Sequence, residues 1–387
     1  KNLTIVEVNK KIFILDAGMR YPDIDMYGVD LVIPNIDYLI NNKQYIQGIF
    51  VSHGHDENVG AIPYLLKQLQ TKVYATHFTI SIIEEMLLEH HLNIKDYKLY
   101  RINPSRVMNF GDVEVSFFNT THSIPESIGI SINTTDGSIV YCTDFNFSSV
   151  SNDKYSTSFD KITDLGKKNV LAVLAESVNA GVTGRITNDT LFEHYYDNIL
   201  IHNKKRIFVA AYVSDLIRIQ KIIDLSVKAG RKVCVLSKKS ERIFKVANNY
   251  NYFIIPDENK LNIDEFSKEE LESLDNVVFI IAGTRNEPYN LLVRMVNNEA
   301  FNLLCYIDVD IRESSIAGVV EKIKLPKAKQ DEIKIVPSED VNILYKKEFK
   351  IFLKLFQNLS CGFSSLFLLF LHDFFSIYCA KYNYNRY

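Results

Sequence analysis

The most informative stretch of this chain is His53-Gly54-His55-Asp56-Glu57-Asn58, which directly follows the short apolar run Ile49-Phe50-Val51-Ser52. The run predicts a strand with two histidines just after its carboxyl end. Two imidazoles two residues apart bind one cation when a turn brings them to the same side, and Gly54 permits that turn. Zn²⁺ and Mn²⁺ both accept imidazole nitrogen. His53 and His55 are therefore candidate metal ligands, although polar loop histidines are the alternative interpretation of the motif alone.

Three further polar residues each lie at or just after the end of a predicted strand. Asp16 ends the strand Lys11–Asp16, and His122 and Asp144 follow predicted strands at residues 113–119 and 138–142. An acid at the Asp16 position can orient metal ligands through hydrogen bonds. For His122 alone, a capped loop histidine would be the favoured interpretation. All four features in this order, each at a strand end, are much rarer by chance than any one of them.

This series of motifs resembles the metallo-β-lactamase family, in which the matching positions line one edge of a β-sandwich. Further segments resemble the RNase J branch of that family, namely Leu15–Gly18, Gly28–Pro34, Gly60–Leu66, Glu176–Ala180 and Gly283–Pro288. The resemblance implies an α/β fold, a metallo-β-lactamase αββα sandwich with an inserted α/β β-CASP domain. It also implies hydrolysis of RNA, both 5′→3′ exonucleolytic and endonucleolytic, with two divalent metal ions.

The order of predicted elements agrees with two domains. The first part is rich in strands, whereas strands and helices alternate after about Thr187, which is typical of a parallel α/β unit. We expect a metallo-β-lactamase-like domain at 1–180 with N-terminal residues missing, and a β-CASP-like domain at 181–335. Residues 336–387 either return to the first domain or form an altered tail. The helices expected are at 59–70, 187–201, 215–229, 240–250 and 288–297.

The histidine motif departs from the family pattern His-x-His-x-Asp-His. By resemblance, one metal site keeps His53, His55, His122 and the bridging Asp144, and Asp144 and Glu57 are the catalytic positions. At the second site, Glu57 is one methylene longer than the family's aspartate. Asn58 stands where the family has a histidine, and its neutral carbonyl oxygen is a poor ligand for Zn²⁺.

The late histidines of the family pattern are also missing. Ile335 stands where one of them is expected, just before a segment, 338–341, that resembles the end of the second β-CASP motif. The final histidine motif is not recognisable, and His372 is a weak candidate for it. The expected cofactor is therefore one Zn²⁺ or Mn²⁺ ion, with a doubtful second site.

The resemblance also assigns residues to RNA and phosphate binding. Ser177 and Asn179 lie in the segment that resembles the acidic opening motif of the β-CASP insertion, and Gly283 and Thr284 lie in its later glycine-rich loop. Such a loop offers backbone N–H groups to phosphate. An ordinary turn between a strand and a helix is the alternative.

Two functions are compatible with the resemblance. They differ in whether the altered histidine motif still supports hydrolysis. Two-metal hydrolysis of phosphodiesters needs both ions, so an RNase J-type enzyme with this motif is expected to be weak. The alternative is a catalytically silent subunit that binds RNA and an active paralogue, as in the degenerate second RNase J of Gram-positive bacteria. Family members form oligomers, so a homo- or hetero-oligomer is expected. Thioester or lactam hydrolysis is disfavoured by the β-CASP-like segments.

Composition limits the remaining classes. The net charge is only −3, so RNA binding would need a local basic groove. Five cysteines without a CxxC pair favour a reduced, cytoplasmic setting without disulfides. Residues 355–371 are too short and polar for a membrane span, and no secretory signal opens the chain. We therefore expect no membrane association.

Overall fold

The computed structural model describes residues 2–22, 26–146, 153–177, 189–204, 206–237, 242–266, 270, 274–284, 288, 291–292, 309–311 and 335–337. The chain forms two units, Lys1–Ala180 with Arg242–Tyr252, and Gly181–Glu241 with Phe253–Tyr387. Helix α8 (Arg242–Asn249) belongs to the first unit, although it lies inside the span predicted for the second domain. The domain boundaries given above remain a prediction.

The first sheet of unit 1 begins with a hairpin. Its strands, in the order β1-β2-β3-β4-β5, are β1 (Thr4–Val8), β2 (Lys11–Leu15), β3 (Ile46–Phe50), β4 (Lys72–Ala75) and β5 (Lys98–Arg101). β1 and β2 are antiparallel, and the other neighbours are parallel. The turn residues Asn9 and Lys10 both have positive φ, 49° and 58°. This is the two-residue turn whose twist matches that of the strands it joins.

The second sheet has the strand order β10-β9-β8-β7-β6. Its strands are β6 (Met108–Asn109), β7 (Glu114–Asn119), β8 (Ile128–Asn133), β9 (Ser138–Cys142) and β10 (Val170–Ala175). A shared apolar core includes Phe13, Leu15 and Phe50 of the first sheet and Phe117 and Ile130 of the second. Alternate residues of each strand point to this core, so the other residues are free to face the helices.

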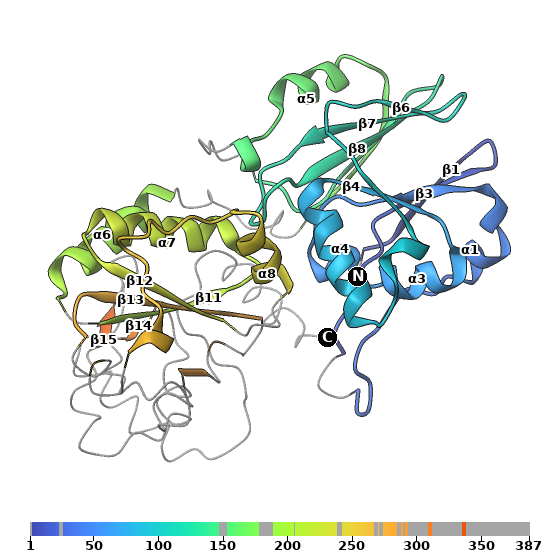
Figure 1. The fold of residues 1–387 in the computed structure, drawn as a ribbon. Helices are drawn as coiled ribbons and strands as arrows, with labels where there is room; N and C mark the ends of the chain where they lie inside the picture. The colour runs from blue at the N-terminus through green and yellow to red at the C-terminus, as the bar shows by residue number, and fades with distance from the viewer. Residues whose placement is uncertain are drawn as a thin grey trace, which may run out of the picture. The chain divides into compact units, whose positions relative to one another are not determined.

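Helices lie on the outer side of each sheet. Figure 1 shows α1, α3 and α4 beside the first sheet and α5 beside the second, which gives four layers. The helices of this unit are α1 (Asp37–Asn41), α2 (Asp56–Val59), α3 (Ile62–Leu69), α4 (His77–Glu89), α5 (Phe159–Gly166) and α8. Three short 3₁₀ helices span Lys43–Tyr45, Ile94–Asp96 and Asp153–Tyr155.

Unit 2 contains a three-stranded parallel sheet in the order β11-β13-β12. Its elements are β11 (Ile207–Tyr212), β12 (Lys232–Ser237), β13 (Val277–Gly283), α6 (Asp189–His202), α7 (Leu216–Lys228) and a 3₁₀ turn at Ile263–Glu265. β13, the central strand, is buried along its whole length. A parallel pair, β14 (Val309–Ile311) and β15 (Ile335–Pro337), follows later in the chain.

Among the described residues, the structure differs from the prediction in one helix and adds others, while most of the helix expected at 288–297 lies outside the described residues. The helix expected at 59–70 begins three residues later, as α3, with Pro63 in its first turn, and Val59 instead ends the separate short helix α2. Helix α4 and strand β8 were not expected. None of the helices among the described residues is long and apolar enough to cross a membrane. Asn179, His372 and residues 338–341 and 355–371 lie outside the described residues.

Candidate metal centre

The histidine motif forms a tight turn between β3 and α2. β3 ends at Phe50, His53 is fully buried three residues later, and His55 is the residue that caps the amino end of α2. A Cβ on Gly54 would lie 2.5 Å from the Cδ1 atom of Ile82. The turn can therefore pack closely against Ile82 because Gly54 has no side chain.

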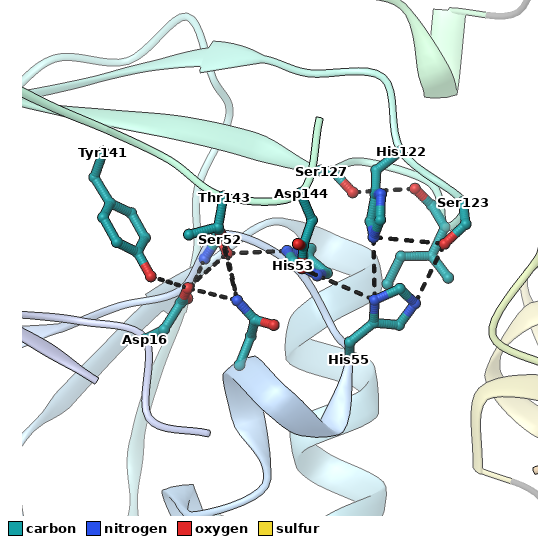
Figure 2. A network of polar contacts seen from close by, with 12 residues as sticks. Asp16, Ser52, His53, His55, His122, Ser123, Ser127, Tyr141, Thr143 and Asp144 are labelled. Atoms are coloured by element: carbon teal, nitrogen blue, oxygen red, sulfur yellow. Dashed lines mark hydrogen bonds and ion pairs between the residues drawn. The ribbon is translucent and has the colours of Figure 1, made fainter. Parts of the chain in front are cut away.

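His122 and Asp144 reach the same point from the second sheet. His122 follows β7, and Asp144 follows β9 with a positive φ of 49°. Figure 2 shows the rings of His53, His55 and His122 and the Asp144 carboxylate turned toward one another. One ligand atom from each of these four residues lies within 4.8 Å of all the others.

The separations fit a single small cation. His55 Nδ1 lies 3.1 Å from both His53 Nε2 and His122 Nε2, and Asp144 Oδ2 lies 3.3 Å from His53 Nε2. Ligand atoms about 2.0–2.1 Å from a tetrahedral ion are about 3.3–3.4 Å apart. Three nitrogens and one carboxylate oxygen suit Zn²⁺ or Mn²⁺. The residues present therefore fit one divalent ion.

The charge of Asp144 also suits a cation. Burial alone would raise the pKa of this carboxyl, but the hydrogen bond and charge of His53, with His122 and His55, hold the pKa well below its usual range. The carboxylate thus stays ionised. Burial, with the charge of Asp144, raises the pKa of the neighbouring Cys142 thiol to about 12, so Cys142 offers no thiolate ligand near neutral pH.

Asp16 lies behind this cluster rather than in it. It is fully buried, and its carboxylate accepts from the Ser52 amide at 2.7 Å, the Ser52 hydroxyl at 2.8 Å and Tyr141 Oη at 2.7 Å. The Ser52 hydroxyl lies 3.0 Å from His53 Nδ1. Burial raises the pKa of Asp16, while its hydrogen bonds and the charge of His53 oppose this rise. Asp16 therefore reaches the ligand His53 through Ser52.

The two altered motif positions have different surroundings. Asn58 is fully buried, and its amide nitrogen donates to Asp16 Oδ2 at 2.7 Å. Its carbonyl oxygen has no hydrogen-bond partner among the described residues. Glu57, by contrast, is exposed and is not part of the four-residue group. The structure thus brings Asn58 beside Asp16 and leaves Glu57 at the surface.

Several residues that support the site were not predicted from the sequence. Ser52 and Tyr141 contact Asp16, and Thr143 Oγ1 lies 3.2 Å from the Ser52 hydroxyl. The signal for Ser52 and Thr143 was their position, each one residue before a candidate ligand. Arg242 donates to Asp56, inside the histidine motif, from a helix 186 residues further along the chain. No local sequence pattern indicates that contact.

The residues expected to bind phosphate lie in different units. Ser177 follows β10 and is exposed, whereas Gly283 ends β13 and is buried, followed by the half-buried Thr284. The carboxyl end of a central parallel strand is a common place for ligands in α/β sheets. Ile335, at the expected histidine position, is the first residue of β15.

Comparisons with known proteins identify both parts of the chain. The family model for the ribonuclease J β-CASP domain matches residues 204–316. Ribonuclease J 2 of Staphylococcus epidermidis is 36% identical over 299 residues, which are 77% of this chain and 53% of that protein. Ribonuclease J 2 of Staphylococcus aureus is 35% identical over 302 residues, with the same coverages. The chain thus spans about half the length of the curated relatives it matches.

A solved structure supports the fold at lower identity. A protein of unknown function from Enterococcus faecalis V583 matches with a TM-score of 0.50 at 14% identity, over 87% of this chain and 90% of that one. The family model confirms the predicted β-CASP domain. The two five-stranded sheets, with helices beside them, have the αββα arrangement predicted for the first domain. Over the 77% of its length that aligns, this chain belongs to the ribonuclease J family.

Proposed function

We propose that this chain is a metal-dependent ribonuclease of the RNase J type that works with a single divalent ion and is therefore weak. The observation that carries the proposal is the convergence of His53, His55, His122 and Asp144 at one point, with Glu57 outside that group. In the proposal, these four residues hold a Zn²⁺ or Mn²⁺ ion.

The chain's own residues prepare that site for phosphodiester hydrolysis. An ion bound there supplies Lewis acidity toward a phosphate oxygen and lowers the pKa of a bound water. His53 is oriented by Ser52 and Asp16, and the ionised Asp144 contributes negative charge that strengthens cation binding. Because a two-metal site also stabilises the leaving oxygen, loss of the second ion predicts slow turnover.

The proposal assigns RNA as substrate and the cytoplasm, where RNA is turned over, as location. Backbone N–H groups near Gly283 and Thr284 are proposed phosphate contacts, because Gly283 ends the central strand of the β-CASP-like sheet. Ser177 and Asn179 are proposed to contact RNA by family resemblance. A homo-oligomer, or a hetero-oligomer with an active paralogue, is proposed on the same ground.

The test is digestion of a 5′-monophosphorylated RNA by the full chain with Mn²⁺, compared with Asp144→Asn. The expected result is slow 5′→3′ release of nucleotides by the unsubstituted chain and none by the variant, because the neutral amide would lack the charge of the ligand carboxylate. Equal rates for the two proteins would contradict catalysis at this site. Fast, processive digestion would contradict the single-ion proposal.

A second candidate function is a catalytically silent subunit of an RNase J complex. The burial of Asn58 favours it, because its amide nitrogen donates to Asp16 and, unlike a histidine nitrogen, offers no lone pair to a second ion. Binding of the chain to an active RNase J paralogue and to RNA, with no hydrolysis above the Asp144→Asn background, is the result this alternative predicts.

A further inference from the structure

The orientation of the Asn58 amide is set by its surroundings. Its nitrogen lies 2.7 Å from Asp16 Oδ2, 3.3 Å from the Ser52 hydroxyl and 3.5 Å from Thr143 Oγ1. A carboxylate only accepts hydrogen bonds, so the NH₂ group and not the carbonyl must face Asp16. The carbonyl oxygen is left without a partner among the described residues.

This amide is connected to a metal ligand in three steps. Asn58 donates to Asp16, Asp16 accepts from the Ser52 hydroxyl, and that hydroxyl lies 3.0 Å from His53 Nδ1. With the serine proton directed at the carboxylate, His53 Nδ1–H donates to the serine oxygen. His53 Nε2 then keeps its lone pair for the point where the four ligand atoms meet.

At this position an asparagine can donate a hydrogen bond to Asp16, as a histidine would, but it cannot also bind an ion through a second ring nitrogen. In both residues a nitrogen is bonded directly to Cγ: Nδ2 in asparagine and Nδ1 in histidine. Either nitrogen can donate to a carboxylate placed as Asp16 is. Histidine would add Nε2 as a ligand for a second ion, and asparagine has no such atom.

The unpartnered carbonyl oxygen shows that the Asn58 amide lowers the stability of the fold at this position. A buried acceptor without a donor costs about 1–3 kcal/mol, and an apolar side chain of similar size would avoid it. The compensating contribution of Asn58 is its hydrogen bond to Asp16, which lies on the path to His53.

We propose that Asn58 is a positioning residue for the metal site formed by His53, His55, His122 and Asp144, and that it acts through Asp16 and Ser52. This inference rests on the proposed metal site. In this view, the position has lost its role as a ligand of a second ion and has kept its role as a hydrogen-bond donor that holds the first ligand histidine in place.

The test is a Co²⁺ titration of the full chain, followed by the visible absorption bands that report tetrahedral coordination. Asn58→Ala should weaken Co²⁺ binding by about 10–100-fold, the usual effect of removing a partner behind a ligand histidine, and should alter the bands. Asn58→His, which restores an N–H donor bonded to Cγ, should keep the affinity for the first ion close to that of the unsubstituted chain.

The matched control is Asn133→Ala at the far end of β8. The Asn133 amide also lies in a polar network, donating to Ser116 at 3.0 Å and accepting from Ser131 and Ser138 at 2.8 Å. Its removal should lower stability without changing Co²⁺ affinity or the spectrum. If both alanine variants weaken Co²⁺ binding equally, the effect is general destabilisation and the positioning role is wrong.

If Asn58→Ala does not fold, two variants with side chains of equal size provide a second test. Asn58→Thr keeps a donor and Asn58→Val does not, so the threonine variant should bind Co²⁺ more tightly. Equal affinities for this pair, or an unchanged affinity for Asn58→Ala, would overturn the inference. If the unsubstituted chain binds no Co²⁺, the proposed metal site itself fails, and the positioning role fails with it.

Discussion

Replacing Arg242 with methionine should lower the free energy of unfolding by about 2 kcal/mol. Arg242 is 21% exposed and donates to Asp56 at 3.0 Å and to Glu89 at 2.7 Å. The contact with the largely buried Asp56 is a charge-assisted hydrogen bond worth about 1.5 kcal/mol. The contact with Glu89, which is 43% exposed, adds about 0.5 kcal/mol because solvent screens it. Tyr21 still donates to Asp56 in the variant, which limits the cost.

The assay is urea unfolding followed by far-UV circular dichroism. Lys245→Met is the matched control, because Lys245 lies on the same helix and pairs with Glu85 while being 46% exposed. That control should lose no more than about 0.5 kcal/mol. A loss for the Arg242 variant as small as that of the control would refute the reasoning, since it would show that the Asp56 contact is as well solvated as an ordinary surface pair.

Three further predictions concern the motif and its supports. Gly18→Ala should cost about 3 kcal/mol or more in the same unfolding assay, because its Cβ would lie 1.5 Å from the backbone oxygen of Glu57; Gly166→Ala, with open space around it, should cost nothing. Tyr141→Phe should cost about 1.5–3 kcal/mol by removing a donor to a buried carboxylate, and a cost near zero would contradict that contact. His122→Ala should abolish tight Zn²⁺ or Mn²⁺ binding in equilibrium dialysis; retained affinity would exclude this histidine as a ligand.

Much of the fold could be predicted because its elements are marked locally. The strand expected at 138–142 has the bounds of β9, and the strand expected at 113–119 differs from β7 by one residue. Helix α4 was missed because its residues from Phe78 to Ile83 are all buried. Over that stretch, buried and exposed residues do not alternate, so the sequence gives no clear period of 3.6 residues.

The site was predictable to the extent that its residues lie at strand ends. His53, His55, His122 and Asp144 were expected together, and the structure brings them together. The exposure of Glu57 could not be foreseen, because it depends on where α2 begins and which way its first turn faces.

The contacts of Arg242 and Asn58 could not be predicted from the sequence either. Arg242 lies in a segment that was expected in the second domain, yet it pairs with Asp56 in unit 1. Asn58 was interpreted only as a lost ligand, because its hydrogen bond to Asp16 joins residues 42 positions apart. Contacts of this kind follow from tertiary packing and have no local signature.

The most direct test of the single-ion account is to count and locate the metal. The purified full chain, loaded with Mn²⁺ and freed of excess ions, should contain one ion per chain by elemental analysis. A crystal of that protein should show one anomalous peak among His53, His55, His122 and Asp144. Two peaks, with the second ligated at Glu57 or Asn58, would contradict the account, and so would the absence of any peak.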